Sequence, residues 1–215
     1  LMIPVYTDVK GKLKPDDEVL AVWGDDGVSV DFYTDRKCNF RCSYCDPRSH
    51  NYKGDLTSLE RMQEAWNKVN PLNVKKIIIS GGEPTLIPRY IDFVKWLKEK
   101  EPEAIIWTLT NGTKQVSYLR ELNKLSLINF SIHPEFINHR YINKLERFCE
   151  EVNLPCKIKI MYLPKYEELI TEIYSMFKGR FEKVYVMTVP LWDMNNNMNL
   201  MKYTPEQLDF IHATQ

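Results

Sequence analysis

The sequence lacks the long apolar run of a membrane-spanning chain. No stretch approaches the roughly 20 consecutive apolar residues that a transmembrane helix needs. Residues 1–19 also lack the basic-then-apolar pattern of a signal peptide. We therefore expect a cytoplasmic protein, because thiols stay reduced in that compartment and the chain's cysteines do not resemble a disulfide framework.

An excess of charge of either sign is missing too. The chain has 29 basic and 29 acidic residues, which gives a formal net charge of zero. This balance does not support a nucleic-acid or membrane role that depends on bulk electrostatics. One local basic cluster is the exception, and it is interpreted either as a solvated loop or as an anion-binding rim. Its members are Arg36, Lys37, Arg41, Arg48 and Lys53.

Internal repeats, low-complexity tracts and linkers rich in proline or glycine are absent, so nothing divides the 215 residues into separate units. A chain of this length suits one domain with a single core. What recurs instead is an apolar run rich in β-forming residues, followed by a segment with helical periodicity. This alternation is the main guide to the fold.

The apolar runs predict a hairpin strand and six core strands. Residues 18–23 and 28–34 are separated by GDDG and are interpreted as a hairpin that leads into the first core strand. Several later runs are nearly continuous in Ile, Val and Leu, which is typical of strands covered on both faces. These runs are 75–80, 104–110, 127–133, 156–163 and 183–189.

Helices are predicted between these strands. Thr57 followed by Glu60 has the pattern of a capping box, and Thr204 followed by Pro205 has the pattern of an N-cap and first helical residue. The remaining helices are expected near 91–101, 115–125, 138–152 and 166–178.

The alternation of strands and helices requires parallel strands with right-handed crossovers. Six strands are too few for a closed eight-stranded barrel, so the predicted fold class is α/β, an open partial (β/α)6 barrel of parallel strands with an N-terminal hairpin strand. A doubly wound sheet is the alternative. Both place ligands at the carboxyl ends of the strands. The cysteines, GGEPT, TNGT, and Ser131 with His133 follow or close strands one to four, so they are expected at one edge.

The cysteine segment TDRKCNFRCSYCDP has the spacing Cys-x3-Cys-x2-Cys at Cys38, Cys42 and Cys45. Short spacings let one loop bind a compact iron–sulfur cluster, and three ligands would leave one iron of a four-iron cluster open, as catalysis needs. A zinc site completed by His50 is the alternative. The spacing alone leaves both interpretations open.

The cysteine loop and GGEPT together resemble a known family. Over approximately residues 30–190 the chain is similar to radical S-adenosylmethionine (radical SAM) enzymes, in the branch that contains molybdenum-cofactor cyclase and the peptide-modifying maturases. The resemblance implies a [4Fe–4S] cluster on Cys38, Cys42 and Cys45 as catalytic and metal-binding residues. It also implies S-adenosylmethionine at the open iron, reductive cleavage to a 5′-deoxyadenosyl radical, and an external one-electron donor that is flavodoxin- or ferredoxin-like.

The same resemblance assigns residues to cosubstrate binding. Glu83 is expected to accept hydrogen bonds from the bound amino group, and Tyr44 is expected beside the adenine. Simple turns at GGEPT and TNGT, loop packing of Tyr44 and a core histidine at 133 remain as alternatives. The predicted cosubstrate-binding residues are Tyr44, Gly81, Gly82, Glu83, Pro84, Thr110, Asn111, Ser131 and His133.

Two further pairs are interpreted more simply. Lys157 and Lys159 share one face of a strand, where they either reach solvent or pair with a carboxylate. Cys149 and Cys156 are expected to be buried structural thiols. The predicted organisation is an N-terminal extension with hairpin strand (1–30), a radical SAM core (31–191) and a C-terminal loop and helix (192–215).

The sequence lacks the cysteine-rich C-terminal extension of some maturases and the C-terminal arginine pair of molybdenum-cofactor cyclase. The leading expectation is therefore a small-molecule or nucleotide-like substrate. A peptide, protein or RNA substrate, including glycyl-radical activation, is the second. A zinc- or cluster-binding interaction module without catalysis is the non-enzyme alternative.

Overall fold

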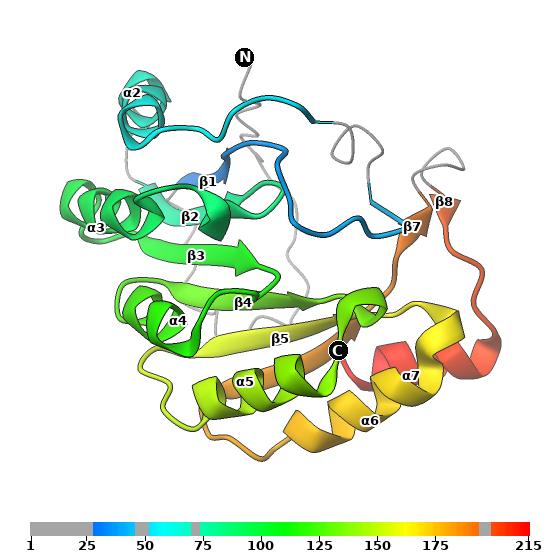
Figure 1. Cartoon of the computed structure of the whole chain (residues 1–215). Helices are drawn as coiled ribbons and strands as arrows, with labels where there is room; N and C mark the ends of the chain where they lie inside the picture. Colours follow the sequence, from blue (N-terminus) through cyan, green and yellow to red (C-terminus); the bar gives the residue numbers. More distant parts are fainter. Residues whose placement is uncertain (1–27, 46–51, 70–73, 194–198) are drawn as a thin grey trace.

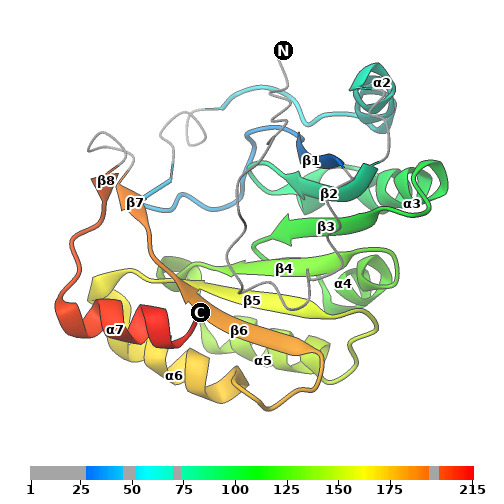
Figure 2. The same cartoon turned by 180° about the vertical axis from the view of Figure 1, so that it is seen from behind.

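The computed structural model describes residues 28–45, 52–69, 74–193 and 199–215. Its centre is one sheet of six parallel strands in sequence order (Figures 1 and 2). This arrangement confirms the predicted α/β class and its open sheet of parallel strands. The strands are β1 (Val28–Tyr33), β2 (Val74–Ser80), β3 (Ile105–Thr110), β4 (Leu127–Ile132), β5 (Cys156–Met161) and β6 (Val184–Val189).

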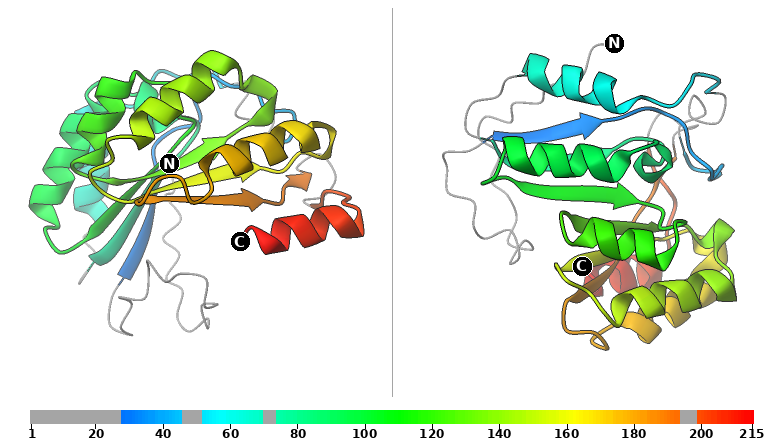
Figure 3. Two further views of the ribbon diagram at one scale, coloured as in Figure 1. Left: turned by 90° about the horizontal axis from the view of Figure 1, so that it is seen from below. Right: turned by 60° about the vertical axis from the view of Figure 1, so that its left-hand side comes forward.

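The helices follow the strands in the predicted order. Figure 3 shows the helices between strands as a curved layer over one face of the sheet, with the last helix beyond β6. This arrangement favours the open partial barrel over the alternative of a doubly wound sheet, which would have helices on both faces. The helices are α2 (Leu59–Val69), α3 (Tyr90–Lys100), α4 (Val116–Asn123), α5 (His139–Cys149), α6 (Glu167–Phe177) and α7 (Pro205–Ala213).

Alternate residues of each strand build the core against this helix layer. Ile77, Ile79, Ile158 and Ile160 are fully buried there, whereas the opposite face carries polar side chains such as Lys157. A helix layer on one face and polar side chains on the other give the strands the alternation of a partial barrel.

Three strands end in a short 3-10 turn that begins with proline, which fits the first helical position because it has no N–H to satisfy. These turns are η2 (Pro84–Leu86), η3 (Pro134–Phe136) and η4 (Pro164–Tyr166). They lie at the carboxyl ends of β2, β4 and β5, the edge where the candidate site was predicted. Each of these prolines therefore begins a turn a few residues after its strand has ended.

The cap predicted for the last helix is present, whereas the cap of α2 lies one residue later than predicted. Thr204 and Gln207 form the capping box of α7, with Pro205 at the first helical position. At α2 the side chain of Ser58 accepts the N–H of Arg61 at 3.2 Å, so the helix begins one residue later than the Thr57 pattern indicated.

The hairpin strand at 18–23 lies outside the described residues, and so do Arg48 and His50. Segment 192–215, predicted as loop and helix, also forms a two-stranded antiparallel ribbon of β7 (Trp192–Asp193) and β8 (Asn199–Leu200). Among the described residues, no helix has the length and apolar character needed to cross a bilayer.

Asn123 joins two neighbouring strand-and-helix units of the fold. Its side chain is fully buried, its Oδ1 accepts the N–H groups of Asn153 and Leu154 at 2.9 and 3.2 Å, and its Nδ2 donates to the carbonyl of Leu154 at 3.0 Å. The amide therefore connects the end of α4 to the loop before β5.

We predict that Asn123→Ala lowers the free energy of unfolding by about 2–3 kcal/mol, because buried backbone groups lose their partners. Urea denaturation measures this loss. The matched control is Asn67→Ala on the exposed face of α2, which should change stability by less than about 0.5 kcal/mol. Equal losses in the two variants would contradict the role of Asn123.

Candidate functional site

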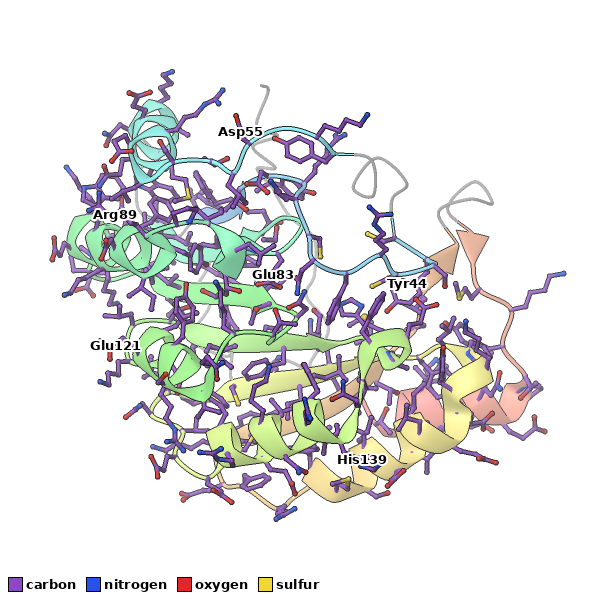
Figure 4. All side chains as sticks on the ribbon, in the orientation of Figure 1. Tyr44, Asp55, Glu83, Arg89, Glu121 and His139 are labelled. Atoms are coloured by element: carbon purple, nitrogen blue, oxygen red, sulfur yellow. The ribbon has the colours of Figure 1, made fainter. Side chains whose placement is uncertain are left out.

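The loops that follow β1 and β2 pair through their backbones. The N–H of Gly82 donates to the carbonyl of Asp35 at 2.7 Å, and the N–H of Glu83 donates to the carbonyl of Lys37 at 2.8 Å. These bonds continue the contact between β1 and β2 beyond the strand ends. They hold the start of the cysteine loop against GGEPT, at the sheet edge where Figure 4 shows Glu83 and Tyr44.

The two glycines of GGEPT are required by this close approach. A Cβ on Gly82 would lie 2.3 Å from the carbonyl oxygen of Lys37 and 2.5 Å from that of Arg36. Gly81 has φ +153°, and its Cβ would lie 2.5 Å from Oγ1 of Thr34. Close approach to a ligand stays a prediction for these glycines; within the chain, the nearest neighbour of Gly82 is the backbone of the cysteine loop, and the nearest neighbour of Gly81 is the side chain of Thr34.

Glu83 connects the loops after β2 and β3. Only 1% of it is exposed. Its Oε1 accepts the N–H and hydroxyl of Thr85 at 3.1 and 2.6 Å and the hydroxyl of Thr110 at 2.7 Å, and its Oε2 accepts the N–H of Asn111 at 2.6 Å. Burial raises the pKa of this carboxyl, and the four hydrogen bonds act in the opposite direction. Both carboxylate oxygens thus bond to donors of the chain itself.

Asn111 extends this connection to the cysteine loop. Its Nδ2 donates to Oδ1 of Asn39 at 2.8 Å and lies 3.8 Å from Sγ of Cys38. Its Oδ1 accepts the N–H and hydroxyl of Thr113, and the Thr113 hydroxyl in turn accepts from Nδ2 of Asn39 at 3.1 Å. The TNGT loop therefore holds the residue next to the first loop cysteine. Asn39 and Thr113 were not singled out from the sequence, because nothing local to either one indicates the other.

Asp35 is a second residue that sequence reasoning missed. It is buried, its Oδ1 accepts the N–H of Lys37 at 2.8 Å, and its Oδ2 accepts the N–H of Thr57 at 3.2 Å. The bond to the backbone two residues on is an Asx turn. The available signal was the aspartate itself, a residue type that often forms such turns. The Asx turn of Asp35 fixes the direction in which the cysteine loop leaves β1.

Tyr44 and His133 lie together beside Cys42. The Tyr44 hydroxyl is 2.6 Å from Nδ1 of His133, and Sγ of Cys42 is 3.3 Å from the same nitrogen. The two rings stack with centroids 5.9 Å apart. Burial lowers the pKa of His133 to about 4, so the imidazole is neutral at pH 7. Ser131 is half-buried on β4, in register with Lys159, and none of these contacts includes it.

The turn after β4 holds the second half of the cysteine loop. Glu135 accepts the N–H of Ser43 at 2.7 Å and forms an ion pair with Lys165 at 3.4 Å. Phe136 stacks on Phe40 with ring centroids 4.4 Å apart and an interplanar angle of 8°. Elements after β1, β2, β3, β4 and β5 therefore all contribute to the environment of the loop, as the edge rule for parallel sheets predicts.

The three cysteines of the loop form no disulfide, and burial favours the protonated form of Cys38 and Cys42. Burial, followed by the charge of Cys45, raises the pKa of Cys42 to about 12. Burial also raises the pKa of Cys38, against the N–H of Phe40, which donates to its Sγ at 3.3 Å. Since metal ligation needs thiolates, binding of a metal centre here would release protons.

The donor set of the loop consists of three thiols. In the described part of the chain, no three His, Cys, Asp or Glu side chains converge on a position for one metal ion. His50, the fourth ligand of the alternative zinc site, lies outside the described residues. Three thiols on one short loop, within electrostatic reach of one another, fit a larger group such as a four-iron cluster.

The remaining residues predicted from the sequence lie outside this group. Cys149 and Cys156 are buried in the core between α5 and β5, as expected. Lys157 lies on the face of the sheet opposite the helices, with its Nζ 5.7 Å from the centre of the Trp107 ring.

Comparison with known proteins gives a family and a fold. The family model described as "Radical SAM superfamily" matches residues 33–168, which include the cysteine loop, GGEPT, TNGT and His133. The structure of SuiB from Streptococcus suis bound to its precursor peptide SuiA matches with a TM-score of 0.56 and 18% identity, over 85% of this chain and 44% of that one.

Two further solved structures match less well. SuiB bound to S-adenosylmethionine gives a TM-score of 0.49 and 20% identity, over 74% of this chain and 38% of that one. BtrN in complex with AdoMet and 2-DOIA gives a TM-score of 0.41 and 15% identity, over 86% of this chain and 85% of that one. The chain spans less than half the length of the SuiB chains.

We predict that Gly82→Ala prevents the cysteine loop from holding iron, because its Cβ would force the backbone at Arg36 and Lys37 away. Iron content after anaerobic reconstitution and circular dichroism measure the two effects separately. Gly179→Ala is the matched control: Gly179 also has a positive φ, +66°, but no atom lies within 4 Å of its Cβ position. The control should cost about 1 kcal/mol and keep its iron, and equal iron in both variants would refute the steric role.

We also predict that Glu83→Gln lowers the free energy of unfolding by about 2 kcal/mol or more. The amide can keep one oxygen acceptor, but its NH2 group then faces another donor, the N–H of Asn111 or the donors at Oε1. Thermal and urea denaturation at pH 7 provide the measurement. Glu103→Gln, the same substitution at an exposed position, is the control. A stability loss at Glu83 no larger than that of the control would contradict the bonding described for Glu83.

Proposed function

The chain belongs to the radical SAM superfamily, and on this premise we propose that it cleaves S-adenosylmethionine reductively at a [4Fe–4S] cluster bound by Cys38, Cys42 and Cys45. One observation carries the proposal. The loops with the three thiols, GGEPT and TNGT are joined by hydrogen bonds at the carboxyl edge of the sheet. The motifs that characterise the family therefore meet in one place.

The three thiolates would hold three irons and leave the fourth for the amino and carboxylate groups of S-adenosylmethionine. When bound, the reduced cluster supplies one electron to the sulfonium, whose carbon–sulfur bond breaks to give methionine and a 5′-deoxyadenosyl radical that abstracts hydrogen from the substrate. The chain itself positions these groups and excludes competing reactions. Because Cys42 is buried, Cys38 and Cys45 are half-buried and the loop is held from several sides, we propose that the geometry of the thiols is set before the cosubstrate arrives.

Residues around the loop are proposed to orient the cosubstrate. Tyr44, stacked with neutral His133, is proposed to contact the adenine. Thr110 and Asn111 are proposed to lie beside the ribose or carboxylate, and the backbone at Gly81 and Gly82 beside the amino group. The proposed contribution of Glu83 is made through the groups that it holds, since its own oxygens accept four hydrogen bonds from the chain.

Pro84 and Ser131 are proposed to have less direct roles in the site. Pro84 begins η2 and is buried, so it is proposed to fix the end of the GGEPT loop. Ser131 lies near the end of β4, two residues before His133, and it is proposed to line the site deeper in the sheet.

For the substrate, we propose a small molecule or a nucleotide-like compound. A peptide is the second candidate, supported by the fold shared with SuiB, which was captured with its precursor peptide. Anaerobic turnover with candidate metabolites or with peptides, followed by mass spectrometry, separates the two, because only the true substrate increases 5′-deoxyadenosine formation and is itself changed.

The cleavage itself gives the most direct test. We predict that the reconstituted protein contains about four irons and four sulfides per chain and releases 5′-deoxyadenosine with dithionite and S-adenosylmethionine. Cys42→Ala should lower iron content and reduce release to background, because one of three thiolates is lost. Cys149→Ala, which removes a core thiol far from the loop, should keep both iron and cleavage while losing about 1 kcal/mol of stability.

Two results would contradict the proposal. One is a wild-type protein that takes up zinc but no iron under anaerobic reconstitution. The other is a cluster that forms normally yet gives no 5′-deoxyadenosine with dithionite.

A further inference from the structure

A basic groove lies between α4 and α5, behind the TNGT loop. Its volume is about 660 Å³, and four cationic side chains line it while no acidic side chain among the described residues does: Arg120, Arg140, Lys144 and Arg147. The N-terminus of α4 opens into the same groove, and its N-cap Gln115 gives it no side-chain cap. The positive end of the helix dipole therefore adds to the charge of the side chains.

Two of the four cations of the groove are available to a partner, and the other two are engaged by the chain itself. Arg140 and Arg147 are exposed, and neither has an ion pair within the described part of the chain. Arg120 pairs with Glu151 at 3.1 Å, but its Nε is buried without a hydrogen-bond partner. In a chain of zero net charge, a groove whose charged lining residues are all cations has a local positive potential.

Contacts on both sides of the TNGT loop connect this groove to the cysteine loop. On the groove side, Nζ of Lys144 donates to the carbonyl of Gly112. On the other side, the hydroxyl of Thr113, the next residue, accepts from Nδ2 of Asn39 at 3.1 Å. Asn39 follows Cys38 in the sequence, so a partner seated in the groove is separated from a cluster ligand by one loop.

The proposed cleavage consumes one electron, and the reductant must come from outside the residues described. Resting on that proposed function, we propose that the groove docks the acidic surface of a small one-electron carrier protein. The carrier is oxidised by one electron, and the sulfonium gains that electron as its carbon–sulfur bond breaks, so the electron count closes. Opposite charges favour fast encounter and a fixed orientation against the TNGT loop, whose Thr113 contacts the residue after Cys38.

The size of the groove favours a protein over a nucleic acid. Arg140 and Arg147 lie about two turns apart on α5, roughly 10 Å along the helix axis. A nucleic-acid backbone, with a charge every few ångströms, is normally held by a longer basic surface. A short groove one loop away from Cys38 matches a compact acidic patch instead.

The test compares two double charge reversals in the anaerobically reconstituted holoprotein. R140E/R147E changes the groove. R61E/K68E makes the same change in charge on α2, another helix of 11 residues whose two cations are also exposed and about two turns apart. The probe is a purified acidic flavodoxin, photoreduced, at low ionic strength. Its affinity for each protein and the rate of 5′-deoxyadenosine formation are measured, with dithionite as the small reductant that needs no docking.

We expect R140E/R147E to lose about ten-fold or more in flavodoxin affinity and in flavodoxin-driven rate, with a dithionite-driven rate within two-fold of wild type. R61E/K68E should match wild type in all three measurements, and added salt should reduce the difference between the variants.

The proposal is overturned if R140E/R147E binds flavodoxin as tightly as R61E/K68E, or if flavodoxin binds none of the proteins. It is equally overturned if a mixed-sequence RNA loses affinity for R140E/R147E while flavodoxin does not. Failure of the proposed function gives a different result, because dithionite would then drive no cleavage in wild type while the binding comparison could still be read.

Discussion

The carboxylate of Glu83 lies at the point where the loops of the candidate site join. A buried carboxylate is costly unless its oxygens are satisfied, and here four donors from two loops satisfy them. The consequence is geometric, since the ends of β2 and β3 cannot move apart without leaving a charge unpaired in the core. Asn111, positioned by this carboxylate, then reaches the residue next to Cys38. The arrangement of the cysteine loop thus depends on an acid that does not touch it through its side chain.

Steric fit supplies the second constraint. Gly81 and Gly82 allow the backbone of the cysteine loop to lie against GGEPT at distances that no side chain could tolerate. Behind the third loop, the hydroxyl of Tyr141 donates to the carbonyl of Asn111 at 2.9 Å, so the helix layer supports the site from its outer side. A loop held in this way has its geometry fixed by the chain itself, which is what pre-organised sites require.

Much of the fold could be predicted from the sequence, because its signals are local. Apolar runs separated by helical periodicity gave six parallel strands, and the Thr204–Pro205 pattern marked the last helix. The cysteine spacing and GGEPT located the edge of the sheet where the site lies. These patterns depend on residues within one turn or one strand of each other.

What could not be predicted depends on pairs distant in the sequence. Nothing near Asn39 indicates Thr113, and nothing near Gly82 indicates that its neighbour is the backbone of Lys37. The start of α2 was placed one residue early, because Thr57 and Ser58 are both residue types that cap helices. In the structure the N–H of Thr57 bonds to the carboxylate of Asp35, and the side chain of Ser58 caps the helix. Strands β7 and β8 have two residues each, which is too few for an alternation of apolar and polar residues to be recognised in the sequence.

The central claim is that three thiolates leave one metal position open for the cosubstrate. Electron paramagnetic resonance of the reconstituted, dithionite-reduced protein with and without S-adenosylmethionine tests it most directly. The account predicts a [4Fe–4S]⁺ signal whose g values change when the cosubstrate is added, because it then ligates the open iron. A cluster signal that is identical in both samples would contradict it.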